Sequence, residues 1–582
     1  MMATTSLEVL RVLGQPLSVE RVLGNGPFAE IGAPSSVALS GQLGLIAVGG
    51  AIGWPRAGSA TGGWRAHRIG IYRRNDLTCR HLVESVWPVN ALAFHPSLPL
   101  LAVGTGSYDG GFSFKGELLL IHLDSGTTVS ALDRPREVRD LVWRHWREGR
   151  VLDIALAPSN DWELGPDALT VGFDAMIERD DWSTVAPKGI DTAELDGPLR
   201  ENQPPRTKED ARKALRRVAA AAGAVWSPRR MVQAVEQLQD GRVLAALDAV
   251  RLESWRQDGA LQWRVLEEGG DGGRLIHVAS DQRTAWVSVP GRRAWQGPRR
   301  SQSPDAVVRH SLADGKLVVP SAPASTRRPR SAVLRALWNA QPGADETQTA
   351  DHAPSPEGNV SDRMPFGAFD PTIILSFPIR HASAFYFLHH VASESGLPPQ
   401  SASQAWVATA ENGENGRPPP VVRRLFPFSW FPPPAPLPRL IGDTEQSRPL
   451  LGGPGTEVAD ATGQALVHSA TLHDPVRAFI VRRHLPDGFP TWVFTTDSVV
   501  IALEWDGHAT VYASLRSGEI VALDAMTGRT RWRHRPTVAG MPVVGLSLAS
   551  SGPGQLVIGT ADGRILLCTT DQLVTCTASP GG

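Results

Sequence analysis

One short pattern returns several times along this chain: an apolar run, a turn that contains glycine, and a second apolar run. Residues 517–534, SGEIVALDAMTGRTRWRH, give a clear copy, in which IVAL is followed by TG and then by Trp532. Such alternation predicts two antiparallel strands joined by a tight turn. Residues 555–568, QLVIGTADGRILLC, repeat the pattern, and their Asp562-Gly563 pair supplies the positive φ that a short hairpin turn needs. The repetition predicts a fold of many similar small sheets.

These segments resemble the WD-type repeat and the pyrroloquinoline-quinone-type repeat of β-propellers. Residues 89–132 also resemble WD-type repeats, with His95-Pro96 after the first apolar run and both Asp124 and Gly126 at the last turn. The resemblance implies an all-β fold: a single closed β-propeller of seven or eight four-stranded blades, with an inserted helix and irregular proline-rich loops. In such a ring each blade buries both faces against its neighbours.

The blade pattern divides the chain into segments. Three stretches carry it: residues 35–182, 229–319 and 449–571. The remaining segments are expected to be a helical insertion, an irregular insertion or atypical blade with a proline-rich tract, and a tail: residues 183–228, 320–448 and 572–582. These boundaries follow the points at which the alternating pattern stops and resumes.

The N-terminal residues 7–23 contain two short apolar runs, 7–13 and Leu17–Leu23, with no partner strand beside them in the sequence. A closed propeller leaves no exposed sheet edge, because its first strand commonly completes its last blade. One of the two runs is therefore expected to pair with the strands near residues 556–567.

Tryptophan is frequent here, with 18 residues against 4 tyrosines. Large rings fill the space between twisted sheets well, so Trp255 and Trp263 are expected to pack between blades. For Trp532, placement in such a core implies that Trp532→Ala costs about 3–5 kcal/mol.

Residues 207–226, TKEDARKALRRVAAAAGAVW, carry apolar side chains at helical spacing. The opposite face gathers five basic residues: Lys208, Arg212, Lys213, Arg216 and Arg217. This face is a candidate partner-binding surface. The alternative is a solvated face on an inserted helix packed against the propeller wall, since charge on the outside of an amphipathic helix is ordinary.

The tract WFPPPAPLPRL, residues 430–440, predicts an extended polyproline-like segment. Trp430 at its start is a second candidate for binding a partner protein. The alternative is a rigid connector across the propeller face, because proline-rich segments are common spacers.

No motif indicates catalysis. The three cysteines, Cys79, Cys568 and Cys576, lack the paired spacing of a zinc site or a disulfide framework and are expected to be reduced structural thiols. Quinone-dependent propeller enzymes use a pair of adjacent cysteines against the cofactor, and this sequence has none. We therefore expect no catalytic, cofactor-binding or metal-binding residues, and no enzyme activity.

The net charge of −1 gives no overall field that attracts nucleic acid or an anionic membrane. No secretory signal pattern and no long apolar span is present, which leads us to expect a cytoplasmic protein. The expected function is a non-enzymatic scaffold that binds other proteins, with no nucleic acid and no membrane insertion; the partner and the oligomeric state stay open. The alternatives are an enzyme or sensor with a small ligand in the central channel, and a recognition module of a larger operon-encoded system.

Overall fold

The computed structural model describes residues 16–570 apart from a series of gaps, the longest being 54–65, 159–170, 319–373, 391–404 and 426–451. Across these described ranges the chain consists mostly of β-strands and has one α-helix, which confirms the predicted all-β class. The strands form small antiparallel sheets: eight have four strands and one has three, besides a few two-stranded pairs.

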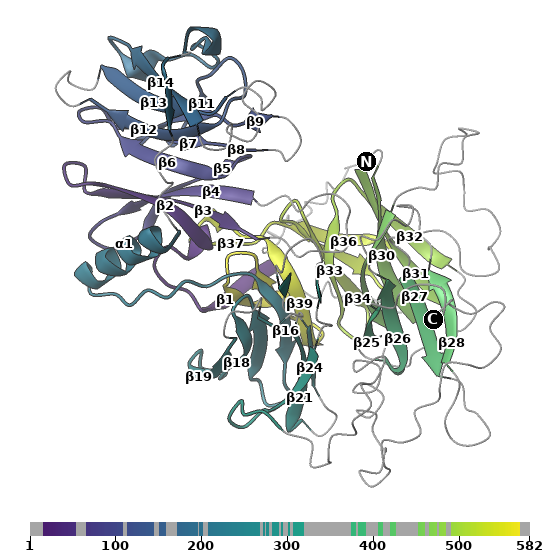
Figure 1. Cartoon of the computed structure of the whole chain (residues 1–582). Coiled ribbons are helices and arrows are strands. Elements are labelled where there is room, and N and C mark those ends of the chain that lie inside the picture. Colours follow the sequence, from purple (N-terminus) through teal and green to yellow (C-terminus); the bar gives the residue numbers. More distant parts are fainter. Residues whose placement is uncertain are drawn as a thin grey trace, which may run out of the picture.

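Three sheets form a first stack (Figure 1). Their strands, in sheet order, are β2 (Ala33–Ser40), β3 (Leu45–Ile52), β4 (Ala66–Arg73) and β5 (Cys79–Ser85); β6 (Val89–Phe94), β7 (Leu100–Thr105), β10 (Leu118–His122) and β11 (Thr128–Ser130); and β12 (Val138–Trp143), β13 (Val151–Leu156), β14 (Val171–Glu178) and β15 (Leu199–Glu201). The short strands β8 (Ser107–Tyr108) and β9 (Phe114–Lys115) pair with each other in the connection between β7 and β10. Aliphatic side chains of neighbouring sheets interlock to form the cores of this stack.

Two further sheets follow helix α1 (Lys208–Ala221). One contains β16 (Val232–Gln237), β17 (Val243–Leu247), β18 (Val250–Trp255) and β19 (Leu261–Leu266), and the three-stranded one contains β20 (Leu275–Val278), β21 (Thr284–Val289) and β24 (Ala306–Ser311). The short strands β22 (Arg293–Ala294) and β23 (Ser301–Gln302) pair with each other.

The C-terminal half supplies the other four sheets. Their strands are β25 (Ile374–Ile379), β26 (Ala382–His390), β27 (Ala405–Ala410) and β28 (Pro420–Leu425); β29 (Gly452–Ala459), β30 (Ala465–His473), β31 (Val476–His484) and β32 (Pro490–Thr496); β33 (Val500–Trp505), β34 (Thr510–Leu515), β35 (Ile520–Asp524) and β36 (Thr530–His534); and β39 (Gly545–Gly552), β40 (Gln555–Thr560) and β41 (Ile565–Thr570), which are joined by β1 (Leu17–Leu23). The pair β37 (Thr537–Val538) and β38 (Met541–Pro542) precedes β39.

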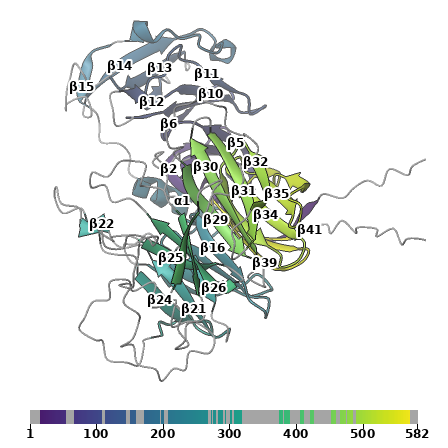
Figure 2. The same cartoon turned by 90° about the vertical axis from the view of Figure 1, so that its right-hand side faces the viewer.

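The expected single closed ring of seven or eight blades is not found among the described residues. Sheets β29–β32, β33–β36, β39–β41 and β16–β19 follow one another side by side, but the β2–β15 stack is a separate column that meets this series near β39 (Figures 1 and 2). Alternation along a strand specifies which face is buried, not which sheet buries it. The segment 320–448, expected to be irregular or an atypical blade, contains the four-stranded β25–β28 sheet.

The chain ends meet in one sheet. Strand β1 pairs antiparallel with β41, from Leu17 opposite Thr570 to Leu23 opposite Ile565. Of the two N-terminal runs that the sequence offers for this pairing, Leu17–Leu23 makes it, whereas residues 7–13 lie outside the described part of the chain.

Helix α1 packs on the face of the first sheet that is turned away from the second sheet, and the last sheet meets the same face around Arg68 and Ile52. The helix's buried residues Ala211, Leu215 and Ala219 lie on one side, and Leu215 and Ala219 pack with Ile46 and Tyr72 of the first sheet. The helix thus covers part of a face that a neighbouring blade would cover in a propeller (Figure 1).

The hairpin predictions are confirmed. Strands β35 and β36 pair across a turn in which Gly528 has φ +69°, and β40 and β41 pair across a turn in which Gly563 has φ +96°. Trp255 and Trp263 lie in clusters shared by two sheets, as predicted. Trp532 packs against the cluster shared by the β33–β36 and β39–β41 sheets, but it is only partly buried and lies on the edge strand β36, so we expect its removal to cost less than that of a fully buried ring.

Candidate functional site

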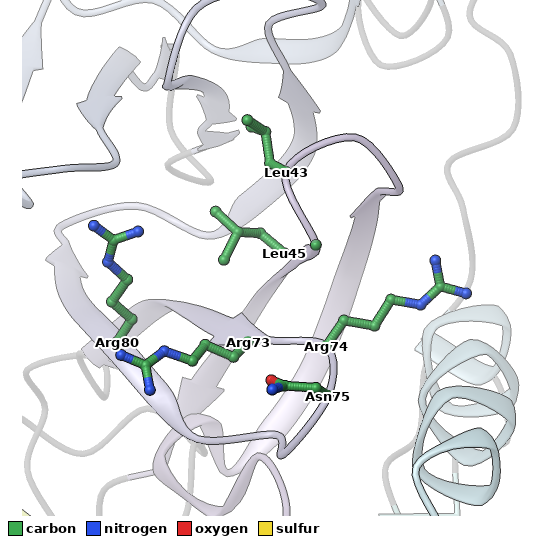
Figure 3. Close-up of a pocket in the computed structure, with 7 residues that line it drawn as sticks. Leu43, Leu45, Arg73, Arg74, Asn75 and Arg80 are labelled. Carbon is green, nitrogen blue, oxygen red and sulfur yellow. The ribbon is translucent and has the colours of Figure 1, made fainter.

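A hollow of about 590 Å³ opens where the β2–β3 and β4–β5 turns of the first sheet lie side by side. We call it the basic hollow; it is lined by Leu43, Gly44, Leu45, Arg73, Arg74, Asn75 and Arg80 (Figure 3). Three arginines and two leucines therefore line one surface depression. Its volume falls within the range of about 300–1,000 Å³ that is usual for ligand pockets.

Hydrogen bonds within the β4–β5 turn hold the arginines in place. The amide of Leu77 donates to the carbonyl of Arg73 at 3.0 Å, and the amide of Arg74 donates across to the carbonyl of Gly44 at 2.9 Å, which ties the two turns together. The Asp76 carboxylate accepts hydrogen bonds from the hydroxyl and amide of Thr78, and these bonds lower the pKa of Asp76. The turn is thus an ordered support for the exposed side chains of residues 73–75.

A β-bulge sets the position of Arg80. His81 pairs with Ile71 and Cys79 pairs with Tyr72, so Arg80 has no partner in the ladder between β4 and β5. A bulged residue is displaced from the regular alternation, and its side chain can be redirected. Here Arg80 reaches the same side of the hollow as Arg73, although the two lie on different strands (Figure 3).

The apolar side of the hollow is the open end of a core. Leu45 is 6% exposed and belongs, with Ile69 and Ile71, to the cluster between the first and second sheets. Leu43 is partly buried against the same cluster. The hollow thus places the partly buried Leu43 next to positive charge.

Two carboxylates lie near the basic hollow at distances longer than hydrogen bonds. The closest nitrogen of Arg73 is 4.0 Å from Asp76, and that of Arg80 is 3.6 Å from Asp124 of the second sheet. Arg74 makes no ion pair among the described residues, and its guanidinium points away from the other two, towards helix α1 (Figure 3). Exposed pairs of this kind contribute little free energy, so the guanidinium groups are available to a ligand.

The predicted helical site lies beside the hollow. Leu77 of the β4–β5 turn packs in the same cluster as Leu215 and Ala219 of α1. Of the five basic residues singled out, Arg212 and Arg216 form ion pairs with Glu209 at 3.5 and 3.3 Å, while Lys208, Lys213 and Arg217 are exposed. Trp430, the other candidate, lies outside the described residues.

Sequence reasoning missed the basic hollow. The available signal was the run Arg73-Arg74-Asn75-Asp76 between two strands, followed by Arg80. In a sequence, such a run is typical of a solvated turn. Arg80 and the leucines of another turn lie beside this run only because of the bulge and the neighbouring sheet.

A second arginine cluster is buried where the first stack meets the last sheet. Arg564 pairs with Asp562 at 2.7 Å and lies 3.5 Å from Glu30, and Arg68 of β4 lies 3.8 Å from Asp562. Tyr72 donates a hydrogen bond to Glu30 at 3.1 Å. Burial acts to raise the pKa of Asp562, but the charge and hydrogen bonds of Arg564 outweigh burial and lower it. This buried network joins the two parts of the molecule.

Neither a metal-binding cluster nor a thiol with a lowered pKa is found among the described residues. No group of three or more His, Cys, Asp or Glu side chains among them is placed to hold a metal ion. Burial raises the pKa values of Cys79 and Cys568 to about 12, so both are thiols at neutral pH and poor nucleophiles. No helix in the described part of the chain is long and apolar enough to cross a membrane.

Comparisons with known proteins give no family. No family model matches the chain, and no curated protein matches its sequence. Among solved structures, the chain is similar to the crystal structure of the computationally designed Ika8 protein, with a TM-score of 0.22 and 10% identity over 83% of this chain and 96% of that one. A likeness at this level carries no functional argument.

Proposed function

We propose that this protein is a non-enzymatic scaffold of the β-propeller, WD-repeat type that binds other proteins in a cytoplasmic assembly. The repeated four-stranded sheets with their glycine turns support a repeat scaffold, although they do not form one closed ring among the described residues. A rigid array of sheets presents turns and loops as binding surface without needing a catalytic pocket.

The basic hollow is the observation that carries the proposal. Surface arginines beside apolar side chains are typical of the centres of protein interfaces, where arginine is enriched. The hollow lies on ordered turns, which lowers the entropy lost on binding. Arg74 links the hollow to the neighbourhood of α1, so the predicted helical face belongs to the same binding region.

Two other functions remain as alternatives. A small ligand in a central channel would make the protein an enzyme or a sensor, and native mass spectrometry of the purified protein would reveal it as a stoichiometric added mass. A recognition module of a larger operon-encoded system would use the same surfaces as a scaffold. The chemistry of the basic hollow favours binding over catalysis.

The test is site-specific photo-crosslinking in cells. A photoreactive phenylalanine derivative at Asn75, in the hollow, is compared with the same group at Asp180, a fully exposed residue elsewhere on the first stack. We expect a discrete protein adduct at Asn75 that disappears in an Arg73→Ala/Arg80→Ala background and is missing at Asp180. Equal crosslinking at both positions, or none at Asn75, would contradict the proposal.

A further inference from the structure

We infer that the basic hollow binds an acidic, aliphatic segment of a partner protein: a carboxylate side chain between Arg73 and Arg80, and an aliphatic side chain against Leu43 and Leu45. The inference rests on the proposed scaffold function and specifies what the scaffold recognises. The hollow has room for a few side chains, so a short segment enters it and not a folded surface.

The charge balance of the hollow fits a carboxylate. Three arginines and no acidic residue line the hollow, and the nearest carboxylates, those of Asp76 and Asp124, lie 4.0 and 3.6 Å from Arg73 and Arg80. A lining with arginines and no carboxylate favours an anionic group. A guanidinium also matches a carboxylate geometrically, because two parallel N–H groups can bond its two oxygens.

The arginines have N–H groups that remain available to a ligand. Arg73 is 61% exposed and Arg80 is 36% exposed, and both meet their nearest carboxylate only at ion-pair distance, beyond a good hydrogen bond. An arriving carboxylate therefore has to displace water and two loose pairs, which cost little to separate. Asn75 adds an amide beside Arg73, able to donate to or accept from the backbone of a bound segment.

The apolar side of the hollow distinguishes a peptide from nucleic acid. Single-stranded nucleic acids bind through aromatic platforms on which bases stack, and the lining holds no aromatic residue. The partly buried Leu43, with the 6% exposed Leu45 beside it, instead offers aliphatic surface next to the guanidinium groups. Carboxylate and aliphatic side chains at neighbouring positions of a segment satisfy both halves of the hollow.

Fluorescence polarisation with the full-length protein tests the inference. The probe is a fluorescein-labelled peptide of sequence GSLELDLGS, and its controls are the amide analogue GSLQLNLGS, the polar acidic analogue GSSESDSGS and an oligothymidylate. We expect the first peptide to bind best, with about tenfold weaker binding for the amide analogue because charge-assisted hydrogen bonds are lost. The polar acidic analogue should bind severalfold more weakly.

Protein variants locate the binding. Arg73→Ala/Arg80→Ala should weaken binding of GSLELDLGS about tenfold or more, and Arg73→Lys/Arg80→Lys should restore part of it, because lysine keeps the charge without the planar fork. The matched control is Arg150→Ala: Arg150 is 56% exposed and lies 3.9 Å from an exposed Asp180, much like Arg73 and Asp76. It should leave the affinity unchanged.

Several results would overturn the inference. They are equal affinity for the acidic and amide peptides, an equal loss with Arg150→Ala, tighter binding of the oligothymidylate, or no binding of the acidic peptide up to about 1 mM, the weak end of specific association. If a protein crosslinks at Asn75 but any of these results is obtained, the scaffold function is retained and only the acidic partner is rejected. If no protein crosslinks at Asn75 and the acidic peptide does not bind, both the scaffold function and the acidic partner are rejected.

Discussion

Strand β4 carries two arginines five residues apart that have opposite surroundings. Arg68 is buried in the network with Asp562, and Arg73 is largely exposed at the rim of the basic hollow. The difference arises from where each lies: Arg68 faces the last sheet, whereas Arg73 ends the strand at the exposed β4–β5 turn. A buried charge must be matched by fixed partners, so the buried network of Arg68 stabilises the fold. The arginines of the basic hollow keep N–H groups that a ligand can bind.

The largest effect should come from removing one partner of the buried network. Asp562→Ala leaves Arg564 buried without its 2.7 Å partner, and breaking such a pair costs about 3–5 kcal/mol of unfolding free energy. Urea unfolding measures this. The double variant Asp562→Leu/Arg564→Met, which removes both charges, should recover a large part of the loss; a single variant as stable as the wild type would show that the network is dispensable.

A buried arginine with a neutral partner should make stability depend on pH. Arg483 donates to His468 at 2.9 Å, and burial followed by the charge of Arg483 lowers the pKa of His468 from 6.5 to about 3. Its contribution to stability is complete above pH 6.5, and it is lost as the pH falls towards 3, because the unfolded chain then binds a proton that the folded chain does not. The slope is at most about 1.4 kcal/mol per pH unit.

The variant His468→Gln tests this slope. Its unfolding free energy, measured in urea at several pH values, should vary less between pH 6.5 and 4 than that of the wild type. The carboxylate of Asp562 contributes in the same direction at lower pH, since its lowered pKa adds stability that is lost only below its ordinary value near 4. Parallel curves for the two proteins would rule out His468 as the titrating group.

The extent of burial should also determine which of two tryptophans costs more unfolding free energy when it is replaced by alanine. Trp182 is 1% exposed and packs at 4.8 Å, ring to ring, against Trp143, so Trp182→Ala should cost about 3–5 kcal/mol. Trp532 is partly buried on an edge strand, and Trp532→Ala should cost about 1–2 kcal/mol, the ordinary size of a destabilising change. The two melting curves settle the order; equal costs would mean that burial does not rank them.

The smallest effect on stability should come from the exposed cluster. Arg73→Ala and Arg80→Ala remove side chains whose ion pairs are 4.0 and 3.6 Å long. Each should change the unfolding free energy by less than about 0.5 kcal/mol, while the binding of the acidic peptide falls. A loss of several kcal/mol in urea unfolding would show that these arginines are structural like Arg68.

Local features were predictable from the sequence, and long-range ones were not. The hairpins around Gly528 and Gly563, the inter-sheet positions of Trp255 and Trp263 and the helix at 207–226 follow from periodicity and turn residues. Which sheet lies beside which was mispredicted as one ring, because each repeat shows its own pattern of burial but not the identity of its neighbour. The basic hollow depends on such a neighbour and on a bulge, so no contiguous motif encodes it.

The pairing of β1 with β41 has a consequence for how the molecule assembles. Strand β1 must wait for its partner β41 to be synthesised, since Thr569 donates a hydrogen bond to Glu20 across 549 residues of chain. Closing so long a loop is costly in entropy, and chains fold largely in the order of their synthesis. The last sheet should therefore complete late and hold an unpaired edge until then, which is the stage at which this chain is most open to wrong association.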